Sequence, residues 1–207
     1  NYARTFAKHK LGALALYYQS DRVSATATDL IASIPFRSLG AVGRMTYSFD
    51  DRYLAEATFG YNGAENFAPD KRYGFFPSFA AGWVVSNEQF FGKIKNVFQL
   101  FKFRASYGIV GSSNIGGRRF SYVGTVGNNG EYQFGQNRND NLLTGIDIAD
   151  YPVDATWETE KDLNLGLEIK TWNNALSLQF DYFTRKRENI FTERKGVPDF
   201  VGVRNNI

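Results

Sequence analysis

The sequence contains no cysteine and only one histidine, His9. The lack of cysteine excludes disulfide frameworks, thiolate metal sites and cysteine nucleophiles. A single histidine excludes a two-histidine metal site, and His9 lies too early and too isolated to suggest a nucleophile–histidine pair. The apolar run from Leu11 to Tyr18 is far shorter than the stretch of about 20 apolar residues that a membrane-spanning helix needs. A helical membrane protein is therefore excluded, whereas a β-barrel, whose strands alternate, stays possible.

Charge of one sign is also scarce, because 24 basic and 21 acidic residues are mixed along the chain and give a net charge of +3. No basic stripe of the kind that binds nucleic acid is present, so no nucleic-acid partner is expected. The aspartates 140, 147, 150 and 154 lack the register of a calcium-binding EF-hand. No Walker-type phosphate loop follows Gly116 and Gly117. We therefore expect no metal, no cofactor and no enzymatic activity.

Aromatic residues make up 16% of the chain, and its 20 glycines also favour strands and tight turns. Apolar and polar side chains alternate over about ten residues, the length that a tilted strand needs to cross a bilayer. The alternation predicts seven strands, at 8–19, 39–49, 53–61, 78–86, 101–109, 162–170 and from Ala175 onward. The expected fold class is all-β, an antiparallel transmembrane β-barrel.

The connections between these segments separate a barrel from a soluble sandwich, whose strands also have one apolar face. Outer-membrane barrels alternate short turns with long loops. The short or medium turns here are 50–51, 87–100 and 172–174, and the long loops are 20–38, 62–77, 110–156 and 187–207. We therefore expect residues 1–207 to form part of one barrel domain with four long extracellular loops. A soluble β-sandwich that binds carbohydrate or acts as an adhesin is the alternative, and an outer-membrane hydrolase comes third.

Charged side chains occupy one phase of the alternation. An Arg or Lys that faces lipid at the membrane centre costs about 2–4 kcal/mol. We therefore expect six residues to face the barrel lumen: Arg44, Glu56, Lys102, Arg104, Glu168 and Asp181. The opposite phase is expected to face lipid at Phe101, Phe103, Tyr107, Leu165, Leu167, Leu178 and Phe180. We expect these charged side chains to form structural pairs, with one another or with a plug, rather than to contact substrate.

Several motifs occur in a fixed order: RYGFFPSFAAGW at 72–83, SNEQFF at 86–91, FRASYGIVG at 103–111, NIGGRRF at 114–120 and RENIF at 187–191. In this order the chain resembles the SusC-like family of TonB-linked outer-membrane transporters over nearly its whole length. Many members carry Arg-Asp-Gly-Ser-Ser where this chain has YNGAE at 61–65, which places it in a subgroup. The resemblance implies a 22-stranded barrel occluded by a plug, of which this chain would be about a third of the wall.

The resemblance also implies function and partners. It implies active import of glycans or peptides across a Gram-negative outer membrane. The partners would be a SusD-like surface lipoprotein, outer-membrane lipid, an oligosaccharide or oligopeptide substrate, and the TonB complex, which acts through a plug outside this chain.

Loop 110–156 is the expected region for contact with ligand or partner. Its rings can stack, and its guanidinium and amide groups can form hydrogen bonds. The candidates are Arg118, Arg119, Phe120, Tyr122, Tyr132, Asn137 and Arg138. Packing of the loop against the partner lipoprotein, or against the barrel mouth, explains the same composition equally well.

Overall fold

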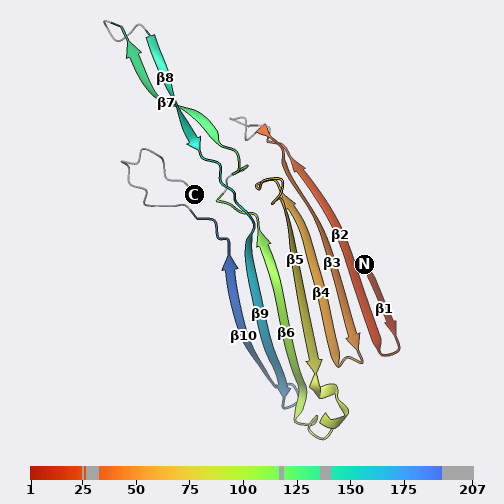
Figure 1. The fold of residues 1–207 in the computed structure, drawn as a ribbon. Coiled ribbons are helices and arrows are strands. Elements are labelled where there is room, and N and C mark those ends of the chain that lie inside the picture. The colour runs from red at the N-terminus through yellow and green to blue at the C-terminus, as the bar shows by residue number, and fades with distance from the viewer. Residues whose placement is uncertain (25, 27–32, 117–118, 136–140, 193–207) are drawn as a thin grey trace. The chain divides into compact units, whose positions relative to one another are not determined.

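A computed structural model describes residues 1–24, 26, 33–116, 119–135 and 141–192 (Figure 1). The chain divides into two compact units. Unit 1 comprises residues 1–64, 73–112 and 157–190, and unit 2 comprises residues 65–72, 113–156 and 191–207. Arg118, Asn137 and Arg138, three of the candidate contact residues, lie outside the described residues. So do residues 193–207, most of the last expected loop.

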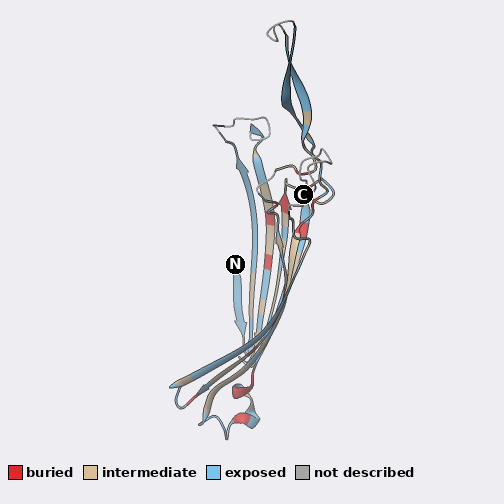
Figure 2. Cartoon of the chain, turned by 90° about the vertical axis from the view of Figure 1, so that its left-hand side faces the viewer, coloured by how far each residue is buried: buried red, intermediate tan, exposed pale blue. Residues whose placement is uncertain are grey.

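Unit 1 contains one antiparallel sheet with the strand order β1-β2-β3-β4-β5-β6-β9-β10, drawn side by side in Figure 1. Each strand therefore pairs with the next strand of the sheet along the chain. The strands are β1 (Tyr2–Phe6), β2 (His9–Arg22), β3 (Phe36–Phe49), β4 (Tyr53–Ala64), β5 (Tyr73–Val84), β6 (Phe98–Ser112), β9 (Glu158–Thr171) and β10 (Leu176–Glu188). Figure 2 shows this sheet from the side as a single layer, mostly of exposed and half-buried residues.

The expected all-β antiparallel architecture is confirmed, with two corrections. The sheet has an eighth strand, β1, which pairs with the first part of β2 and is too short to show a clear alternation. The loop expected at 110–156 contains a hairpin of β7 (Thr125–Phe134) and β8 (Asn141–Asp150). This hairpin is a separate two-stranded sheet and belongs to unit 2.

Most strands also extend beyond the regions of clear alternation at the ends that lead into the long loops, so the long connections are shorter than expected. β4 ends at Ala64 and β5 begins at Tyr73, which leaves 65–72 as their connection. β2 ends at Arg22 and β3 begins at Phe36, and β6 and β9 are separated by 113–157. At the other end of the sheet lie the connections 7–8, 50–52, 85–97 and 172–175. We call this the short-turn end and the opposite one the long-loop end.

The two shortest turns that the sequence predicts, at 50–51 and 172–174, consist of residues with a positive φ angle. Asp50 and Asp51 both have φ 52°, and Trp172, Asn173 and Asn174 have φ between 52° and 67°. Asn and Asp tolerate this left-handed conformation better than most side chains because they are short and polar. The turn expected at 87–100 is instead a segment at 85–97 that contains the 3₁₀ turns η1 (Val85–Asn87) and η2 (Gln89–Phe91).

Strand pairing gives the sheet two chemically different faces. One row across the sheet is Tyr53–Trp83–Phe103–Leu167–Phe180, and this side of the sheet is named the apolar face. Leu54–Gly82–Arg104–Gly166–Asp181 is the neighbouring row on the other side, named the polar face. Many large side chains of the apolar face are exposed, among them Phe79 (58%), Phe103 (44%), Leu165 (45%) and Phe180 (58%). A soluble monomer rarely exposes so large an apolar surface.

Two features near the N-terminal edge depart from this segregation. Arg4 lies on the apolar side of β1, where its guanidinium group is 4.5 Å from the centre of the Phe6 ring. Leu14 and Leu16 of β2, whose facing the sequence left undecided, lie on the polar face opposite Arg44 and Val42. Among the described residues, none of the helical segments has the length and apolarity to cross a membrane.

Unit 2 has a small packed base besides its hairpin. The buried side chains Phe67, Ile115, Ser121 and Ala155 come from three separate stretches of the chain. Hydrogen bonds tie these stretches together: the Asn66 side chain donates to the Ser113 carbonyl at 2.9 Å, and the Val153 amide donates to the Ser121 carbonyl at 2.7 Å. The base of this unit is therefore an ordered structure rather than an open loop.

Candidate functional site

The polar face carries a cluster of charges across β6, β9 and β10. Arg104 lies between two acids, with its Nε 3.5 Å from Glu168 Oε1 and a second nitrogen bonded to Asp181. The Lys102 ammonium is 3.6 Å from the same Glu168 carboxylate. Gly166 leaves room for this arrangement, because a Cβ there would lie 2.2 Å from Arg104 Nε. Four of the six residues expected to share a phase therefore meet in one network.

The remaining two expected residues, Arg44 and Glu56, form their own pair on the same face, at 2.7 Å. A further cluster lies toward the long-loop end, where Arg185 Nε is 2.8 Å from Glu160 and Arg187 pairs with the same carboxylate. Each cluster contains both signs of charge. Exposed ion pairs contribute only about 0.2–1 kcal/mol each. In this arrangement the charged side chains neutralise one another within the sheet. It fits a structural role better than the binding of a charged substrate.

Small side chains leave a shallow hollow on this face near the short-turn end, with a volume of about 540 Å³. Gly12, Ala80 and Gly82 form its floor, and Glu56, Lys102 and Arg104 lie along it. Glu56, Lys102 and Arg104 are each paired with a charged residue outside this lining, so the hollow presents polar but neutralised groups and can receive a hydrated protein segment or a polar ligand. This surface is unsuited to contact with hydrocarbon, because transfer of a charged side chain into the bilayer costs free energy.

The described candidates of unit 2 are partly engaged with one another. The Arg119 guanidinium lies 4.9 Å from the centre of the Phe120 ring and 4.0 Å from the Glu65 carboxylate. The Phe120 and Tyr122 rings meet edge to face at 6.2 Å. Tyr132 is separate from these three in the chain, on β7 opposite Leu143, and is 65% exposed. The structure thus groups Arg119, Phe120 and Tyr122 at the base of the unit and places Tyr132 on its hairpin.

The hairpin exposes apolar side chains that the sequence analysis did not single out. Val126 lies opposite Ile148, and Ile146 follows on the same face; their exposures are 68%, 42% and 77%. Leu142 and Leu143 add further exposed apolar surface at 52% and 57%. The alternation Ile146-Asp147-Ile148 is the sequence signal that indicates a strand here, but it is too short to be distinctive.

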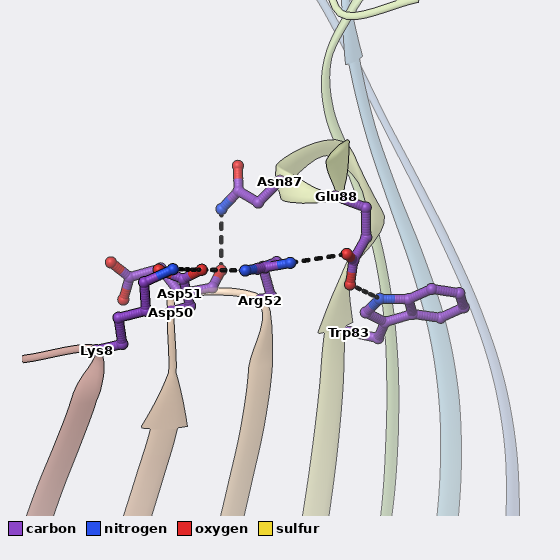
Figure 3. A network of polar contacts seen from close by, with 7 residues as sticks. All are labelled: Lys8, Asp50, Asp51, Arg52, Trp83, Asn87 and Glu88. Atoms are coloured by element: carbon purple, nitrogen blue, oxygen red, sulfur yellow. Dashed lines mark hydrogen bonds and ion pairs between the residues drawn. The ribbon is translucent and has the colours of Figure 1, made fainter. Parts of the chain in front are cut away.

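A second missed feature is a network of polar contacts at the short-turn end (Figure 3). Arg52 joins two turns, because it pairs with Asp50 and donates to Glu88 at 3.0 Å. Glu88 also accepts a hydrogen bond from the Trp83 indole at 3.1 Å, and Lys8 pairs with Asp50. Arg52 and Glu88 lie 36 positions apart, so no local sequence pattern connects them.

This network shifts the pKa of both of its carboxyl groups. Hydrogen bonds from Arg52 and then Lys8 hold the pKa of Asp50 below its usual value. Hydrogen bonds with Tyr53 and Trp83, followed by that from Arg52, lower the pKa of Glu88. Both groups are therefore ionised at neutral pH, and the network is a structural clamp between the β3–β4 turn and the 85–97 segment.

In the part of the chain that the structure describes, no three His, Cys, Asp or Glu side chains are grouped to hold a metal ion. Unit 1 contains a single-layer antiparallel sheet with an exposed apolar face and an ion-paired polar face. Short and long connections alternate at its two ends. These properties define a segment of a transmembrane β-barrel wall.

Comparison with known proteins gives the family. The TonB-dependent receptor P3 of Formosa agariphila is 30% identical over 235 residues, which cover all of this chain and 22% of that protein. The TonB-dependent receptor SusC of Bacteroides thetaiotaomicron is 31% identical over 156 residues, 74% of this chain and 15% of that protein. The chain belongs to the SusC-like family of TonB-dependent receptors, as its motifs predict. No family model matches the chain.

Solved structures agree on the fold. The structure of the RagAB peptide transporter matches with a TM-score of 0.74 at 20% identity. The match covers 99% of this chain and 24% of the transporter chain. The RagAB peptide importer in its open-open state has a TM-score of 0.68 at 21% identity. At these identities the likeness concerns the fold alone. The chain spans about a fifth to a quarter of the length of the relatives it matches most fully.

Proposed function

We propose that this chain forms about a third of the wall of a TonB-dependent importer in the outer membrane of a Gram-negative bacterium. The observation that carries the proposal is the two-faced sheet of unit 1, because the apolar face needs lipid and the polar face needs water or protein. The relatives, which are TonB-dependent receptors, support the same class.

The apolar face has the height that a bilayer requires. From Tyr73 to Trp83, β5 rises about 33 Å at about 3.3 Å per residue. A strand tilt of about 40° reduces this to a height of about 25 Å, close to that of the lipid-facing band of known barrels. Stacked rings of Tyr61 and Tyr73, 5.4 Å apart, lie near one end of the band, and Tyr53 and Trp83 lie at the other. The residues expected to face lipid all lie on this face, and Arg44, Glu56, Lys102, Arg104, Glu168 and Asp181 face the lumen in this proposal.

The two ends of the sheet follow the topology of outer-membrane barrels, with short turns in the periplasm and long loops outside. The short-turn end is then periplasmic. The connections 23–35, 65–72 and 113–157, together with the chain beyond β10, then lie outside the cell. The ion pairs of the polar face hold the wall together and border the plug, which in this family lies inside the barrel.

The exposed hairpin β7–β8 is the element best suited to a protein partner. Its face with Val126, Ile146 and Ile148 is apolar, exposed and part of the connection between β6 and β9. Such a surface is typical of the buried centre of a protein interface. In this proposal a SusD-like surface lipoprotein docks on the hairpin, and Arg119, Phe120 and Tyr122 lie near the mouth of the barrel.

The substrate is an oligosaccharide or an oligopeptide in this proposal, bound between the lipoprotein and the barrel. The RagAB neighbour is a peptide transporter, and its fold supports the peptide alternative without deciding between the two. Entry is driven by the TonB complex through the plug. A soluble sandwich is disfavoured, because in the described part of unit 1 no second sheet covers the apolar face.

Purification of the full-length protein from its native membrane tests the partner. The wild type should retain a surface lipoprotein, Ile146→Asp should lose most of it, and the matched control Glu131→Gln on the same hairpin should retain it. Uptake by cells with and without TonB, measured with labelled oligopeptides and oligosaccharides, tests the transport itself. If Ile146→Asp and Glu131→Gln retain the lipoprotein equally, the hairpin is not its docking site. If uptake is the same without TonB, the proposed mechanism is wrong.

A further inference from the structure

The connection at 85–97 differs from the other connections at the short-turn end by exposing a group of apolar side chains. Phe90 is 68% exposed, Ile94 47% and Val97 50%. Backbone hydrogen bonds from Lys95 to Phe91 (3.1 Å) and from Phe98 to Ile94 (3.0 Å) give this segment helical turns. Ile94 and Val97 are three positions apart within these turns and so share one side, and Phe90 lies four positions before Ile94. We call these three exposed apolar side chains the ridge.

The base of this segment is fixed to the apolar face of the sheet. Phe91 is buried and its ring is 6.0 Å from that of Phe101, which packs in turn against Phe103 at 5.4 Å. Glu88 is bonded to the indole of Trp83, another residue of the apolar face. The ridge therefore continues the apolar face beyond its ring of aromatic side chains at the short-turn end.

Two lysines accompany the ridge. Lys93 and Lys95 are exposed and lie on either side of Ile94 in the sequence. Apolar side chains beside lysines on a short helical segment are the combination that binds membrane surfaces, with the apolar side in the boundary between head groups and acyl chains. Lysines near an anionic lipid surface add electrostatic attraction.

We propose that residues 90–97 are a lipid-binding element that inserts Phe90, Ile94 and Val97 into the membrane surface at the short-turn end. Lys93 and Lys95 bind the phosphates of anionic phospholipids there. The occupant is a lipid surface because the segment packs on the apolar face, which contacts lipid in the proposed function, and because the two cations complement anionic head groups. The inference rests on the proposed facing of the wall. In addition, it predicts that this segment fixes the depth of the barrel in the membrane and prefers anionic lipid.

The test uses the full-length protein in vesicles of an equimolar mixture of phosphatidylglycerol and phosphatidylcholine. A fluorescent probe is attached to single cysteines at Ile94, at Asn96 as the matched control on the same segment, and at Phe103 on the apolar face. Lipids brominated on the acyl chain and aqueous iodide serve as quenchers. The Ile94 probe should be quenched by brominated lipid and shielded from iodide, and the Asn96 probe should show the reverse.

The outcomes separate this inference from the function it rests on. If the Phe103 probe is quenched by brominated lipid but the Ile94 probe is quenched by iodide, the segment lies in water and the inference is wrong. A probe at Ile94 that neither quencher reaches would mean that protein covers the ridge, which also contradicts it. If even Phe103 is not reached by brominated lipid, the proposed facing of the wall itself fails. In a parallel experiment, Lys93→Gln and Lys95→Gln should each weaken the preference for phosphatidylglycerol by about fivefold; an unchanged preference would overturn the assignment of the lysines.

Discussion

The most direct energetic consequence of the two-faced sheet concerns neighbouring residues in the middle of β9. Leu165 is on the apolar face, between Ala105 of β6 and Tyr182 of β10. Asn164 points to the opposite face, between Ser106 and Phe183. In the proposed facing of the wall, an arginine introduced at Leu165 meets lipid, and an arginine introduced at Asn164 meets the lumen.

The expected cost follows from the position of Leu165 on the apolar face at the centre of β9, a strand of 14 residues whose ends lie on either side of the proposed bilayer. An arginine that faces lipid near the midplane destabilises a barrel by about 2–4 kcal/mol. At about 1.4 kcal/mol per factor of ten, Leu165→Arg should lower the ratio of folded to unfolded protein by about 30- to 700-fold. The control Asn164→Arg places the same side chain beside Asp162 on the polar face and should change the stability by no more than about 0.5 kcal/mol.

The unfolding free energies of the two variants are measured by urea titration of the full-length protein as it folds into phospholipid vesicles. Tryptophan fluorescence is the signal. Resistance of the folded barrel to detergent at room temperature confirms that each variant reaches its native state. The reasoning would be refuted by an equal loss for the two variants, or by a larger loss for Asn164→Arg.

Further predictions concern the polar networks. Arg104→Gln should lower the unfolding free energy by about 1 kcal/mol, because its two ion pairs are partly exposed. Combination with Asp181→Asn should cost less than the sum of the two single changes, and strict additivity in a double-mutant cycle would contradict the pairing. The pKa values of Asp50 and Glu88 are lowered in the folded protein, so their contribution to stability is present above their unfolded pKa and lost as the pH falls through the folded one. The urea midpoint should therefore decrease below about pH 4, and Glu88→Gln should flatten this dependence; an identical pH profile for the variant would count against the clamp.

The sequence predicts the wall well because a strand with one lipid-facing side must alternate strictly. The alternation in β6, β9 and β10 depends only on side-chain period, and strand pairing converts it directly into the rows Phe103–Leu167–Phe180 and Arg104–Gly166–Asp181. The charges of the polar face were predictable for the same reason. Pairing of these charges with one another was also predictable, because residues of both signs occur on the same phase of these strands.

The parts that the sequence did not predict depend on contacts between distant residues or on segments too short for a pattern. β1 has only five residues, and its place in the sheet depends on pairing with β2. The Arg52–Glu88 pair joins residues of different turns. The hairpin in unit 2 has a broken register between Asn128 and Glu131, which disrupts the alternation of β7. Composition alone indicates the candidate contact residues, and their role in binding stays a prediction.

The proposed place of this chain in a barrel wall depends most on the facing of the sheet, with the apolar face toward lipid and the polar face toward the lumen. Accessibility of single cysteines at the adjacent residues Phe103 and Arg104, in the full-length protein within sealed outer-membrane vesicles, tests it most directly. With this facing, the cysteine at 103 should react with a lipid-partitioning maleimide and resist a charged, membrane-impermeant thiosulfonate, and the cysteine at 104 should show the opposite. Reaction of the cysteine at 103 from water together with reaction of that at 104 from lipid would contradict it.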